Sequence, residues 1–482
     1  MTRNVLSVAS ECAPLLKTGG LADVVGALPG ALARHGWSMR VLMPAYRGLL
    51  PRLGGGTALW SGDLQGGKAR IVAAEASGTR MLLLDAPHLY DREGGPYAGA
   101  KGDHPDNPQR FAALCKAARL VAEGGLSDGW QPEILHAHDW QAGLAPAYLR
   151  YAGASPVKTV MTVHNIAFQG IAGADLLGGL GLPVAEFHAD ALEYYGNVSA
   201  LKAGLVTADA ITTVSPTYAS ELMRPEFGMG LEGIISKRAD CLHGILNGID
   251  TSVWSPAADP EIVAYDARTL KKKAQNRARL LDEFGLGDVP GPLVVVVSRL
   301  TTQKGIDLIP EVLPEFILAG GGLVVLGSGD AGLEEAMRRA AGRFPGRVGV
   351  KIGYDEALSH RIFAGGDAVL VPSRFEPCGL TQMMGLSYGT VPVVAATGGL
   401  ADTVIHANPM ALAAKAATGI TFHPTDATAL GDALRRLVQL HGDTAQWQMV
   451  QKNGMKQPVD WNASSAAYAR LYESLLSESP AA

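Results

Sequence analysis

The sequence predicts an α/β protein built from two doubly wound, Rossmann-like domains. Short apolar segments alternate with stretches of helical periodicity along the 482 residues, and near-continuous apolar strands between helices are typical of parallel sheets covered on both faces. A chain of this length is too long for one hydrophobic core. The pattern also occurs twice, so we expect two such domains facing a central cleft, because ligands of these folds bind beyond the carboxyl ends of the strands.

The first half of the chain contains six apolar segments that we expect to form strands. Two stretches between them, residues 110–122 and 141–151, have the spacing of apolar residues that is typical of helices. We assign residues 1–250 to this first domain. The expected strands are Val5–Ala9, Arg40–Met43, Met81–Leu84, Ile134–His136, Thr159–Val163 and Ala210–Val214.

The second half repeats this pattern after a turn-rich segment between Asn247 and Pro260. A helix rich in lysine and arginine is expected near residues 269–284. We assign residues 251–457 to the second domain, and residues 458–482 to an amphipathic terminal helix that is expected to cross back to the first domain. The expected strands are Leu293–Val297, Leu323–Leu326, Val348–Ile352, Ala368–Val371 and Val391–Val394.

Composition and charge exclude several classes of function. The formal net charge of −5 lacks the basic footprint of a nucleic-acid-binding protein, and no apolar run approaches the length that crosses a bilayer. The N-terminal residues lack a signal-peptide core. The four cysteines lie far apart without CxxC spacing, so neither a zinc site nor a disulfide framework is expected. We therefore expect a cytoplasmic protein without nucleic-acid or membrane partners.

A glycine pair, Gly19 and Gly20, lies in the first expected strand-to-helix turn, between Lys17 and Asp23. Glycines let the backbone turn tightly and let a ligand approach it, while the following helix N-terminus favours phosphate. Lys17 adds a mobile cation. An ordinary glycine-rich connector is the alternative for a lone pair of this kind. The segment Thr397–Thr403 repeats the Gly-Gly-Leu-Ala-Asp pattern, which favours a ligand gripped from both sides.

Polar side chains follow two neighbouring strands of the first half, where a doubly wound fold displays functional groups. We expect Asp139 to be catalytic or substrate-binding, and His164 and Asn165 to bond sugar hydroxyls. A metal ion held by His136 and His138 is an alternative that the lack of a fourth nearby ligand disfavours. The two histidines could also simply satisfy local backbone groups.

Arg299 and Lys304 follow the strongest expected strand of the second half, with no acidic residue between them. A buried pair of cations without carboxylates demands an anionic partner. A diphosphate fits, because two fixed cations can stabilise the charge that develops on a leaving phosphate without a metal ion. The alternative is a solvated arginine and lysine on a loop.

Further candidates follow later strands of the second half. Tyr354 ends a strand and could stack on a nucleobase, although a core tyrosine is an alternative. Glu376 is positioned to grip sugar hydroxyls, and Cys378 has no histidine base in its own segment, so we expect it to bind or pack rather than to act as a nucleophile. A helix whose N-terminus can take a phosphate is expected to open with Gly379, Leu380 and Thr381.

Together these motifs resemble those of bacterial glycogen synthases of the starch synthase type, which are retaining glycosyltransferases with the GT-B fold of two Rossmann domains. The resemblance extends from about Val5 to Tyr472. The segments that carry it are Lys17–Asp23, Asp85–Pro87 with Tyr97, His136–Gln141, His164–Gly170, Asn247–Asp250, Ser298–Gly305, Arg374–Gln382 and Thr397–Asp402.

The resemblance implies transfer of glucose from ADP-glucose to the non-reducing end of an α-1,4-glucan with retention of configuration; no cofactor or metal ion is expected. It implies that Arg299 and Lys304 hold the donor diphosphate. By the same resemblance Glu376 and His164 contact the transferred glucose, and Asp139 lies at the reaction centre. The remaining donor-side residues are Lys17, Gly19, Gly20, Asp23, Asn165, Asn247, Cys378, Gly379, Leu380, Thr381 and the adenine-stacking Tyr354, and the acceptor-side residue is Tyr97.

One position departs from the related transferases. They often place a second glutamate eight residues after the first, where it contacts ribose, and synthases of this type commonly have a tyrosine there; this chain has Met384. A related α-glucosyltransferase that uses another nucleotide sugar or acceptor is therefore the alternative. A dehydrogenase would need GxGxxG after the first strand, where this chain has KTGGLAD. A non-catalytic glucan-binding protein is disfavoured because Asp139, Arg299, Lys304 and Glu376 occur together.

Overall fold

The computed structural model describes residues 3–477, in which the chain forms two compact units. Unit 1 comprises Met1–Asn247 together with Trp461–Ala482, and unit 2 comprises Gly248–Asp460. The chain therefore passes from one unit to the other twice. None of the described helices combines the length and the apolarity that crossing a membrane requires.

A nine-stranded sheet forms the centre of unit 1. All six strands expected in the first half are present near its middle and pair in parallel. The order of the sheet is β14-β13-β9-β8-β1-β2-β5-β4-β3. The strands β2 to β5 therefore lie outward from β1 on one side of the sheet, and β9, β13 and β14 lie outward from β8 on the other. The strands are β1 (Arg3–Val8), β2 (Trp37–Pro44), β3 (Thr57–Leu64), β4 (Gly67–Ala76), β5 (Thr79–Asp85), β8 (Ile134–His138), β9 (Lys158–Val163), β13 (Ala210–Thr213) and β14 (Leu242–Gly244).

The antiparallel strands β3 and β4, at one end of this sheet, were not predicted from the sequence. From Trp60 to Leu64 partly buried and exposed residues alternate in β3, and β4 alternates in the same way from Gly67 to Ile71, as expected where one face is solvated. Gln65 and Gly66 join them with φ values of 50° and 84°, the left-handed pair that a tight hairpin turn requires. The sequence signal for such a hairpin is an alternation of apolar and polar residues, with a period of two, on both sides of a glycine-containing turn.

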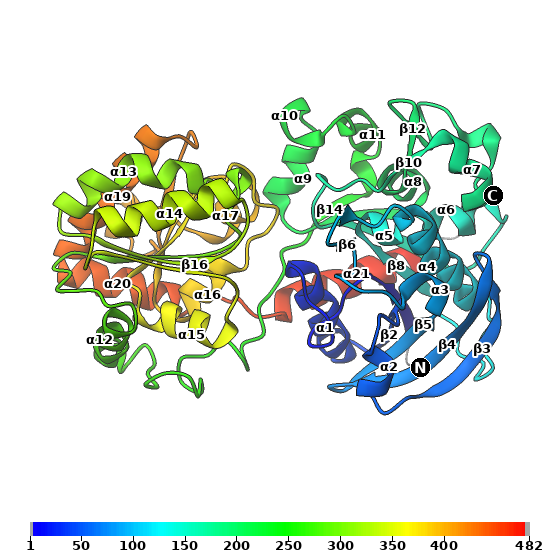
Figure 1. The fold of residues 1–482 in the computed structure, drawn as a ribbon, viewed down its shortest axis with the longest axis horizontal. Helices are drawn as coiled ribbons and strands as arrows, with labels where there is room; N and C mark the ends of the chain where they lie inside the picture. Colours follow the sequence, from blue (N-terminus) through cyan, green and yellow to red (C-terminus); the bar gives the residue numbers. More distant parts are fainter. Residues whose placement is uncertain (1–2, 478–482) are drawn as a thin grey trace. The chain divides into compact units, whose positions relative to one another are not determined.

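Two groups of helices cover the faces of this sheet (Figure 1). On one face α1 (Gly20–Ala33) and α21 (Asn462–Ser477) pack with Val5, Ile134 and Val160 of the strands. The connections after β5, β8 and β9 supply the opposite face, as right-handed crossovers require. These helices are α4 (Asn107–Ala122), α5 (Asp139–Ala142), α6 (Leu144–Tyr151) and α8 (Ala200–Thr207).

The terminal helix is an integral part of unit 1. Tyr468 and Tyr472 of α21 are fully buried, and the ring of Tyr472 lies edge-on to Trp37 at a centroid distance of 5.1 Å. Tyr472 also hydrogen-bonds with its hydroxyl to Nδ1 of His136 at 2.7 Å. The last helix thus reaches the strand that leads to Asp139.

Smaller elements complete unit 1 around the sheet. A second, three-stranded sheet has the order β10-β12-β11, and a two-stranded hairpin pairs β6 with β7. The elements are α2 (Leu49–Arg52), α3 (Pro87–Tyr90), β6 (Ala98–Gly99), β7 (Gly102–Asp103), β10 (Ile171–Gly173), α7 (Leu177–Leu180), β11 (Glu193–Tyr194), β12 (Asn197–Ser199), α9 (Pro216–Leu222), α10 (Pro225–Gly228) and α11 (Glu232–Lys237).

Unit 2 is built on a six-stranded parallel sheet with the order β17-β16-β15-β18-β19-β20. In chain order this is 3-2-1-4-5-6, the doubly wound arrangement, whose switch point lies between β15 and β18. All five expected strands are present, and β20 was not anticipated. The strands are β15 (Leu293–Val297), β16 (Gly322–Gly327), β17 (Val348–Ile352), β18 (Ala368–Val371), β19 (Val391–Ala395) and β20 (Ile420–Phe422).

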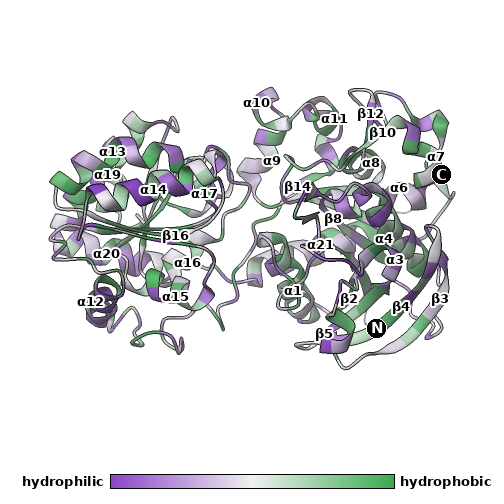
Figure 2. Ribbon diagram, in the orientation of Figure 1, coloured by the Kyte–Doolittle hydropathy of each residue, from purple (hydrophilic) through white to green (hydrophobic). Residues whose placement is uncertain are grey.

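Helices cover both faces of this sheet (Figure 1), and its strands are the most hydrophobic part of the unit (Figure 2). The expected basic helix near residues 269–284 is present as α12, whose outer surface is hydrophilic. The helices are α12 (Lys273–Glu283), α13 (Ile309–Leu318), α14 (Ala331–Arg343), α15 (Glu356–Gly365), α16 (Thr381–Ser387), α17 (Gly398–Thr403), α18 (Pro409–Ala413), α19 (Ala427–Gly442) and α20 (Thr444–Gly454).

Candidate active site

In unit 1 the candidate residues gather at the carboxyl ends of β1, β8 and β9. The switch point of this sheet lies between β1 and β8, where connections leave in opposite directions. The loop after β1 carries Lys17, the first residue after β8 is Asp139, and His164 follows β9 directly. The fold therefore brings together residues that are 25 to 147 positions apart in the chain.

Asp139 is a buried carboxylate in an unusual backbone conformation. Its φ of 54° lies in the left-handed region, which a non-glycine residue adopts only when the surroundings hold it there. Its Oδ1 accepts hydrogen bonds from the backbone N–H groups of His164 (2.7 Å) and Asn165 (3.3 Å). Burial raises the pKa of Asp139 to about 7, the two backbone donors oppose this rise, and the charge of Glu11 adds to it.

Two buried histidines, His136 and His138, and the partly buried His164 back this carboxylate. His138 Nδ1 lies 3.0 Å from His164 Nε2, and His138 Nε2 lies 3.2 Å from Ser7 Oγ. Burial lowers the pKa of His164 to about 3, so its ring is neutral at physiological pH and presents one donor and one acceptor nitrogen. His136 contacts Thr162 through Nε2 and the Tyr472 hydroxyl through Nδ1. Both histidines that suggested a metal thus bond to side chains of the protein, and in the part of the chain that is described no cluster of three potential ligands could hold an ion.

The Lys17 loop is open to solvent. Lys17 Nζ forms an ion pair, about one-third exposed on both sides, with Oδ1 of Asp23 at 2.8 Å, and Asp23 lies in the first turn of α1, as expected. Gly19 is extended, with φ −161°, and an added Cβ would meet no atom within 4 Å. The chain's own packing therefore does not require a glycine at this position, whereas a ligand that approaches the backbone would.

Glu11 organises this loop, a role that was not predicted from the sequence. Its buried carboxylate accepts hydrogen bonds from Thr18 N at 2.5 Å and from Thr18 Oγ1 at 2.6 Å. The hydroxyl of Tyr97, the expected acceptor-side residue, donates to Glu11 Oε1 at 2.5 Å and lies 2.7 Å from Ser10 Oγ. The available signal was an acidic residue just past the first expected strand, at the sheet edge that also displays Asp139.

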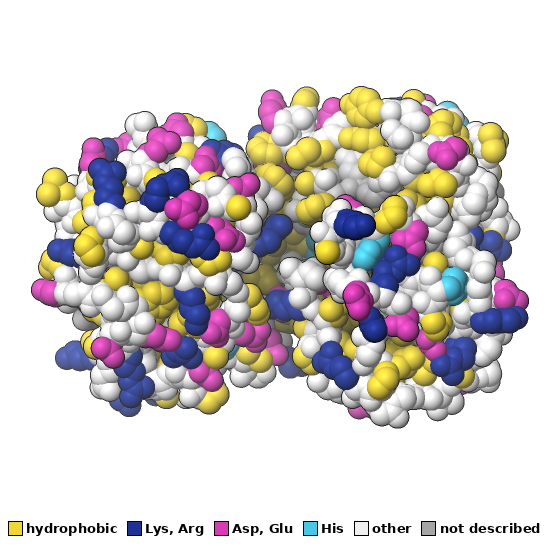
Figure 3. Space-filling model, in the orientation of Figure 1, with side chains coloured by type: hydrophobic (Ala, Val, Ile, Leu, Met, Phe, Trp, Pro, Cys, Tyr) yellow, Lys and Arg dark blue, Asp and Glu magenta, His cyan; other side chains and the backbone are white. Residues whose placement is uncertain are grey.

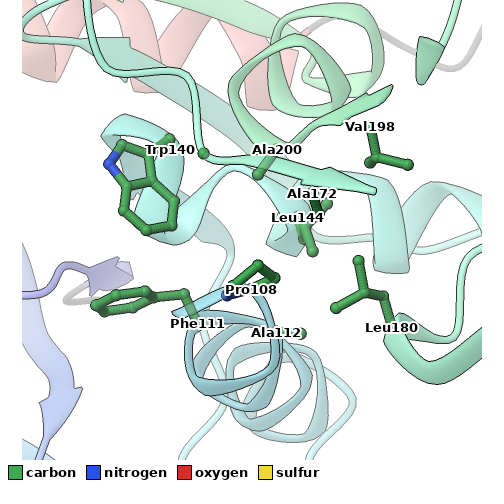
Figure 4. A pocket seen from close by; sticks show the side chains of 10 residues that line it. Pro108, Phe111, Ala112, Trp140, Leu144, Ala172, Leu180, Val198 and Ala200 are labelled. Atoms are coloured by element: carbon green, nitrogen blue, oxygen red, sulfur yellow. The ribbon is translucent and has the colours of Figure 1, made fainter. Parts of the chain in front are cut away.

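A small apolar pocket lies behind α5 (Figure 4). The rings of Trp140 and Phe111 meet edge to face at its rim, with centroids 4.9 Å apart. Gly170 borders the pocket with φ 61°, and a Cβ there would lie 2.3 Å from the Trp140 ring. Trp140, the residue after Asp139, is therefore packed between Phe111 of α4 and Gly170, and this packing fixes the start of α5.

Two asparagines expected on the donor side have different surroundings. Asn165 Oδ1 accepts a hydrogen bond from Ala167 N at 3.0 Å, so part of this side chain stabilises its own loop. Asn247 is buried, and its Oδ1 has no hydrogen-bond partner among the described residues. A buried acceptor of this kind is costly unless a ligand or water satisfies it.

In unit 2 the candidate residues gather at the switch point between β15 and β18. Lys304 Nζ lies 2.6 Å from Oε2 of Glu376, and Ser373 Oγ donates to the same oxygen at 2.8 Å. The prediction of a buried cation pair without a carboxylate is wrong, because Glu376 pairs with Lys304 and Arg299 is exposed. The partner lies 72 positions away in the chain, so inspection of one loop could not find it.

A second ion pair joins the two loops. The guanidinium of Arg374 binds both carboxylate oxygens of Asp307, each at 2.7 Å, in the bidentate geometry that gives specificity as well as energy. The backbone N–H of Arg374 also donates to Gln303 O at 2.9 Å. These contacts hold the Glu376 segment in register with the Lys304 segment.

The segment after Glu376 packs on the second Gly-Gly loop. Cys378 is buried, and α16 begins at Thr381, two residues after the expected start at Gly379, whose φ is 71°. Leu380 caps this helix. Tyr354 is 70% exposed, which excludes the core alternative and leaves its ring accessible.

Comparisons with known proteins agree with this arrangement. The family model described as the starch synthase catalytic domain matches residues 4–237, and that described as glycosyl transferases group 1 matches residues 291–440. The glycogen synthase of Cereibacter sphaeroides (strain ATCC 17025 / ATH 2.4.3) is 68% identical over 98% of both chains. The chain belongs to the bacterial glycogen synthase family. The glycogen synthase of Paracoccus denitrificans (strain Pd 1222) is 57% identical, over 98% of this chain and 100% of that one.

A solved structure extends the comparison to the fold. The catalytic domain of starch synthase IV from Arabidopsis thaliana, bound to ADP and acarbose, has a TM-score of 0.88 and 31% identity, with 99% of this chain and 100% of that chain covered. The predicted fold class, two doubly wound domains of the GT-B type, is confirmed. The protein is a hexosyltransferase of the glycogen synthase family.

Proposed function

We propose that the protein transfers glucose from ADP-glucose to the non-reducing end of an α-1,4-glucan, with retention of configuration. Relatives at 68% and 57% identity are named glycogen synthases, and the similar starch synthase structure carries ADP and acarbose. The observation that carries the proposal is the Lys304–Glu376 pair at the switch point of unit 2, where ligands of such sheets bind.

Lys304 suits a diphosphate because it is a nearly buried cation with spare donors. Its side chain is 16% exposed, and an ammonium group has three N–H bonds, of which one is directed at Glu376. We propose that Lys304 and the exposed Arg299 neutralise the charge of the departing diphosphate, without a metal ion or cofactor. Around this pair we propose that Gly379, Leu380 and Thr381 bind the phosphates. Cys378 would line the site, and Tyr354 would stack on the adenine.

In unit 1 we propose that Asp139 and His164 act on the sugar. The Asp139 carboxylate would stabilise an oxocarbenium-like state, and the neutral His164 ring would hydrogen-bond a sugar hydroxyl. Lys17, Gly19, Gly20 and Asp23 would contact the donor, together with Asn165 and Asn247, and Tyr97 would contact the acceptor.

The proposed step is attack on the face from which the diphosphate departs. The bond between the anomeric carbon and the phosphate oxygen breaks, and a new bond forms to the 4-hydroxyl oxygen of the glucan. The proton of that hydroxyl passes to the leaving phosphate. This route keeps the α configuration and needs no enzymatic nucleophile, and exclusion of water would limit hydrolysis of the donor.

The test compares labelled ADP-glucose and UDP-glucose as donors on glycogen. We expect the protein to transfer glucose from ADP-glucose and to form α-1,4 linkages. UDP-glucose is the informative comparison because Met384 stands where related transferases often have a glutamate that contacts ribose. Lys304→Ala should lower kcat/KM by about 10²–10³, the usual loss for one donor to a developing charge. Lys351→Ala removes an exposed lysine of the same unit and should leave kcat/KM within about twofold. Near-normal turnover of Lys304→Ala would refute the assigned role.

We further propose that the reaction takes place in the cytoplasm. In the part of the chain that the structure describes, none of the four cysteines, Cys12, Cys115, Cys241 and Cys378, forms a disulfide, as is usual for proteins of a reducing compartment. Expression of a tagged chain in its host followed by fractionation tests this proposal, and recovery in the periplasmic fraction would contradict it.

A further inference from the structure

An exposed aromatic side chain stands at the tip of the β11–β12 hairpin. Tyr195 is 77% exposed and lies in the two-residue turn between Glu193–Tyr194 and Asn197–Ser199. Its φ is 48° and that of Gly196 is 79°. Two consecutive positive φ values define the tight hairpin turn in which asparagine or aspartate is strongly preferred before glycine.

Tyrosine is an unfavourable choice for this turn. A bulky residue with positive φ is an outlier whose backbone costs free energy, and a side chain that is 77% exposed gains little from burial. The fold itself therefore does not explain the residue. Since strained residues cluster where they act, the conformation points to a role for the ring outside the hairpin.

The ring of Tyr195 is also held in place. It meets the ring of Tyr194 edge to face, with centroids 4.7 Å apart, and the Tyr194 hydroxyl donates to Met229 O. A Cβ at Gly230 would lie 2.8 Å from the Tyr195 hydroxyl oxygen, so the glycine makes room for the phenol. A rigid ring that is fixed in advance loses little entropy when it binds a partner.

Two further exposed hydrophobic side chains lie on segments that are linked to this hairpin by hydrogen bonds. Met229 is 41% exposed, and its carbonyl also accepts a hydrogen bond from Gln169 Nε2 at 3.3 Å. Phe168, next to Gln169, is 54% exposed and lies four positions after His164. Hydrophobic side chains are visible on the face that carries α10, α11 and β12 (Figure 3). We call Phe168, Met229 and Tyr195 the Tyr195 platform.

We propose that the Tyr195 platform binds a segment of the glucan polymer, outside the part of the site that holds the reacting sugar. The proposal rests on the proposed function, which makes a glucan the acceptor. Sugar rings present flat C–H faces that pack on aromatic rings, while their hydroxyls need polar partners at the rim. Glu193 and Asn197 flank Tyr195: the carboxylate accepts from Gly196 N, and the amide donates to Tyr195 O.

The size of the platform favours a glucan over a protein. Three partly exposed side chains offer at most a few hundred Å², whereas a stable protein interface needs about 800 Å² from each partner. A glucan chain needs only a narrow row of contacts, and it gains affinity by occupying several sites of one enzyme at once. Phe168 and His164 lie in the same loop after β9, four positions apart in the chain.

Tyr195→Asn is the decisive variant because it gives the turn its preferred residue. We expect the melting temperature to be unchanged or raised, since Asn-Gly suits the two positive φ values. We expect the dissociation constant for glycogen, measured by affinity electrophoresis without a donor, to rise about five- to tenfold. With maltotriose as acceptor, kcat and the KM for ADP-glucose should stay unchanged. Tyr195→Phe keeps the ring and should bind glycogen like the parent.

Leu318→Asn is the matched control, because Leu318 is an 89% exposed apolar residue at the end of α13 in unit 2. It should not change glycogen binding. Parent-like glycogen affinity of Tyr195→Asn would overturn the proposal, and so would a change in oligomeric state on sedimentation with glycogen affinity intact. A ring-dependent affinity for glycogen in a protein that transfers no glucose would support the platform and refute the proposed function, so the two failures are distinguishable.

Discussion

The two units contain the same five-residue motif, Gly-Gly-Leu-Ala-Asp, at the start of a helix after a parallel strand, but they use its glycines differently. In unit 1 the motif is Gly19–Asp23 and in unit 2 it is Gly398–Asp402. An added Cβ at Gly19 meets no atom within 4 Å, whereas one at Gly398 would lie 2.0 Å from Glu376 O. Identical motifs therefore do not imply identical physical requirements.

In unit 2 the glycines are needed for internal packing. Gly398 has φ 44°, and a Cβ at Gly399 would lie 2.2 Å from Cys378 O. Gly399 N also donates to the carbonyls of Glu376 and Pro377. The second loop is thus the support on which the Glu376 segment rests, and in unit 1 the corresponding space is left open.

The largest expected effect comes from breaking the packed loop. Gly398→Ala would place a methyl group against a backbone carbonyl at a left-handed position, so the Glu376 segment must move. We expect stability to fall by about 2–4 kcal/mol and kcat/KM to fall by about 10²–10³, because Glu376 and Lys304 lose their geometry. Thermal unfolding and the glucose-transfer assay measure the two effects.

A control for this change lies in the same motif. Ala401 is exposed, so Ala401→Ser should leave both stability and transfer close to those of the parent. A stable and fully active Gly398→Ala protein would show that the close approach to Glu376 O has no functional weight.

The carboxylates beside the two loops differ as well, which gives a prediction on pH. Burial raises the pKa of Asp139 to about 7, while Glu376 is paired with Lys304. An unfolded aspartate has a pKa near 4, so between pH 5 and 7 folding takes up a proton and the free energy of unfolding falls as pH rises. Asp139→Asn cannot ionise, and its Oδ1 can still accept from His164 N.

We therefore expect the stability of Asp139→Asn relative to the parent to grow by about 2–3 kcal/mol from pH 5 to pH 8. Urea unfolding at both pH values, followed by tryptophan fluorescence, measures it. Transfer by the parent should rise with pH toward a plateau above about 7, where Asp139 is a carboxylate, and the variant should lack this rise. A pH-independent difference in stability would contradict the raised pKa.

The sequence was sufficient to predict the sheets because their strands are continuous apolar runs. Leu293–Val297, Val348–Ile352 and Ala368–Val371 are present with the expected bounds. The strands that it did not predict lie at or next to sheet edges or in small sheets, where one face is solvated and the apolar run is broken, as in Thr57–Leu64 and Gly67–Ala76.

The candidate site was predictable as a set of loops but not as a set of contacts. Strand ends identify Asp139, Lys304 and Glu376, because parallel strands bring their carboxyl ends to one edge. The ion pair between the last two joins loops 72 positions apart, and Glu11 acts through a carboxylate that only burial distinguishes from a surface residue. Pairings across the fold depend on packing, which one sequence does not display.

A smaller effect is expected from closing the open loop. Gly19→Ala adds a methyl group where the protein has free space, at an extended φ that alanine adopts without strain. Stability should change by less than about 0.5 kcal/mol. If the donor approaches this backbone, we expect kcat/KM for ADP-glucose to fall about tenfold or more. Gly30→Ala, at an exposed position of α1 with equally open space, should add up to about 1 kcal/mol of stability and leave transfer unchanged.

The smallest effects are expected from variants that each remove one of the two charges of the open loop, Lys17 or Asp23. The Lys17–Asp23 pair is about one-third exposed on both sides, so breaking it should cost at most about 1 kcal/mol of stability. If Lys17 serves the donor phosphates, Lys17→Ala should raise the KM for ADP-glucose about five- to tenfold, because it removes the cation. Asp23→Asn retains that cation and should raise KM less, with a stronger dependence on salt, since the freed ammonium is screened more readily. Equal KM values for the two variants would show instead that the ion pair acts only as a local constraint on the start of α1.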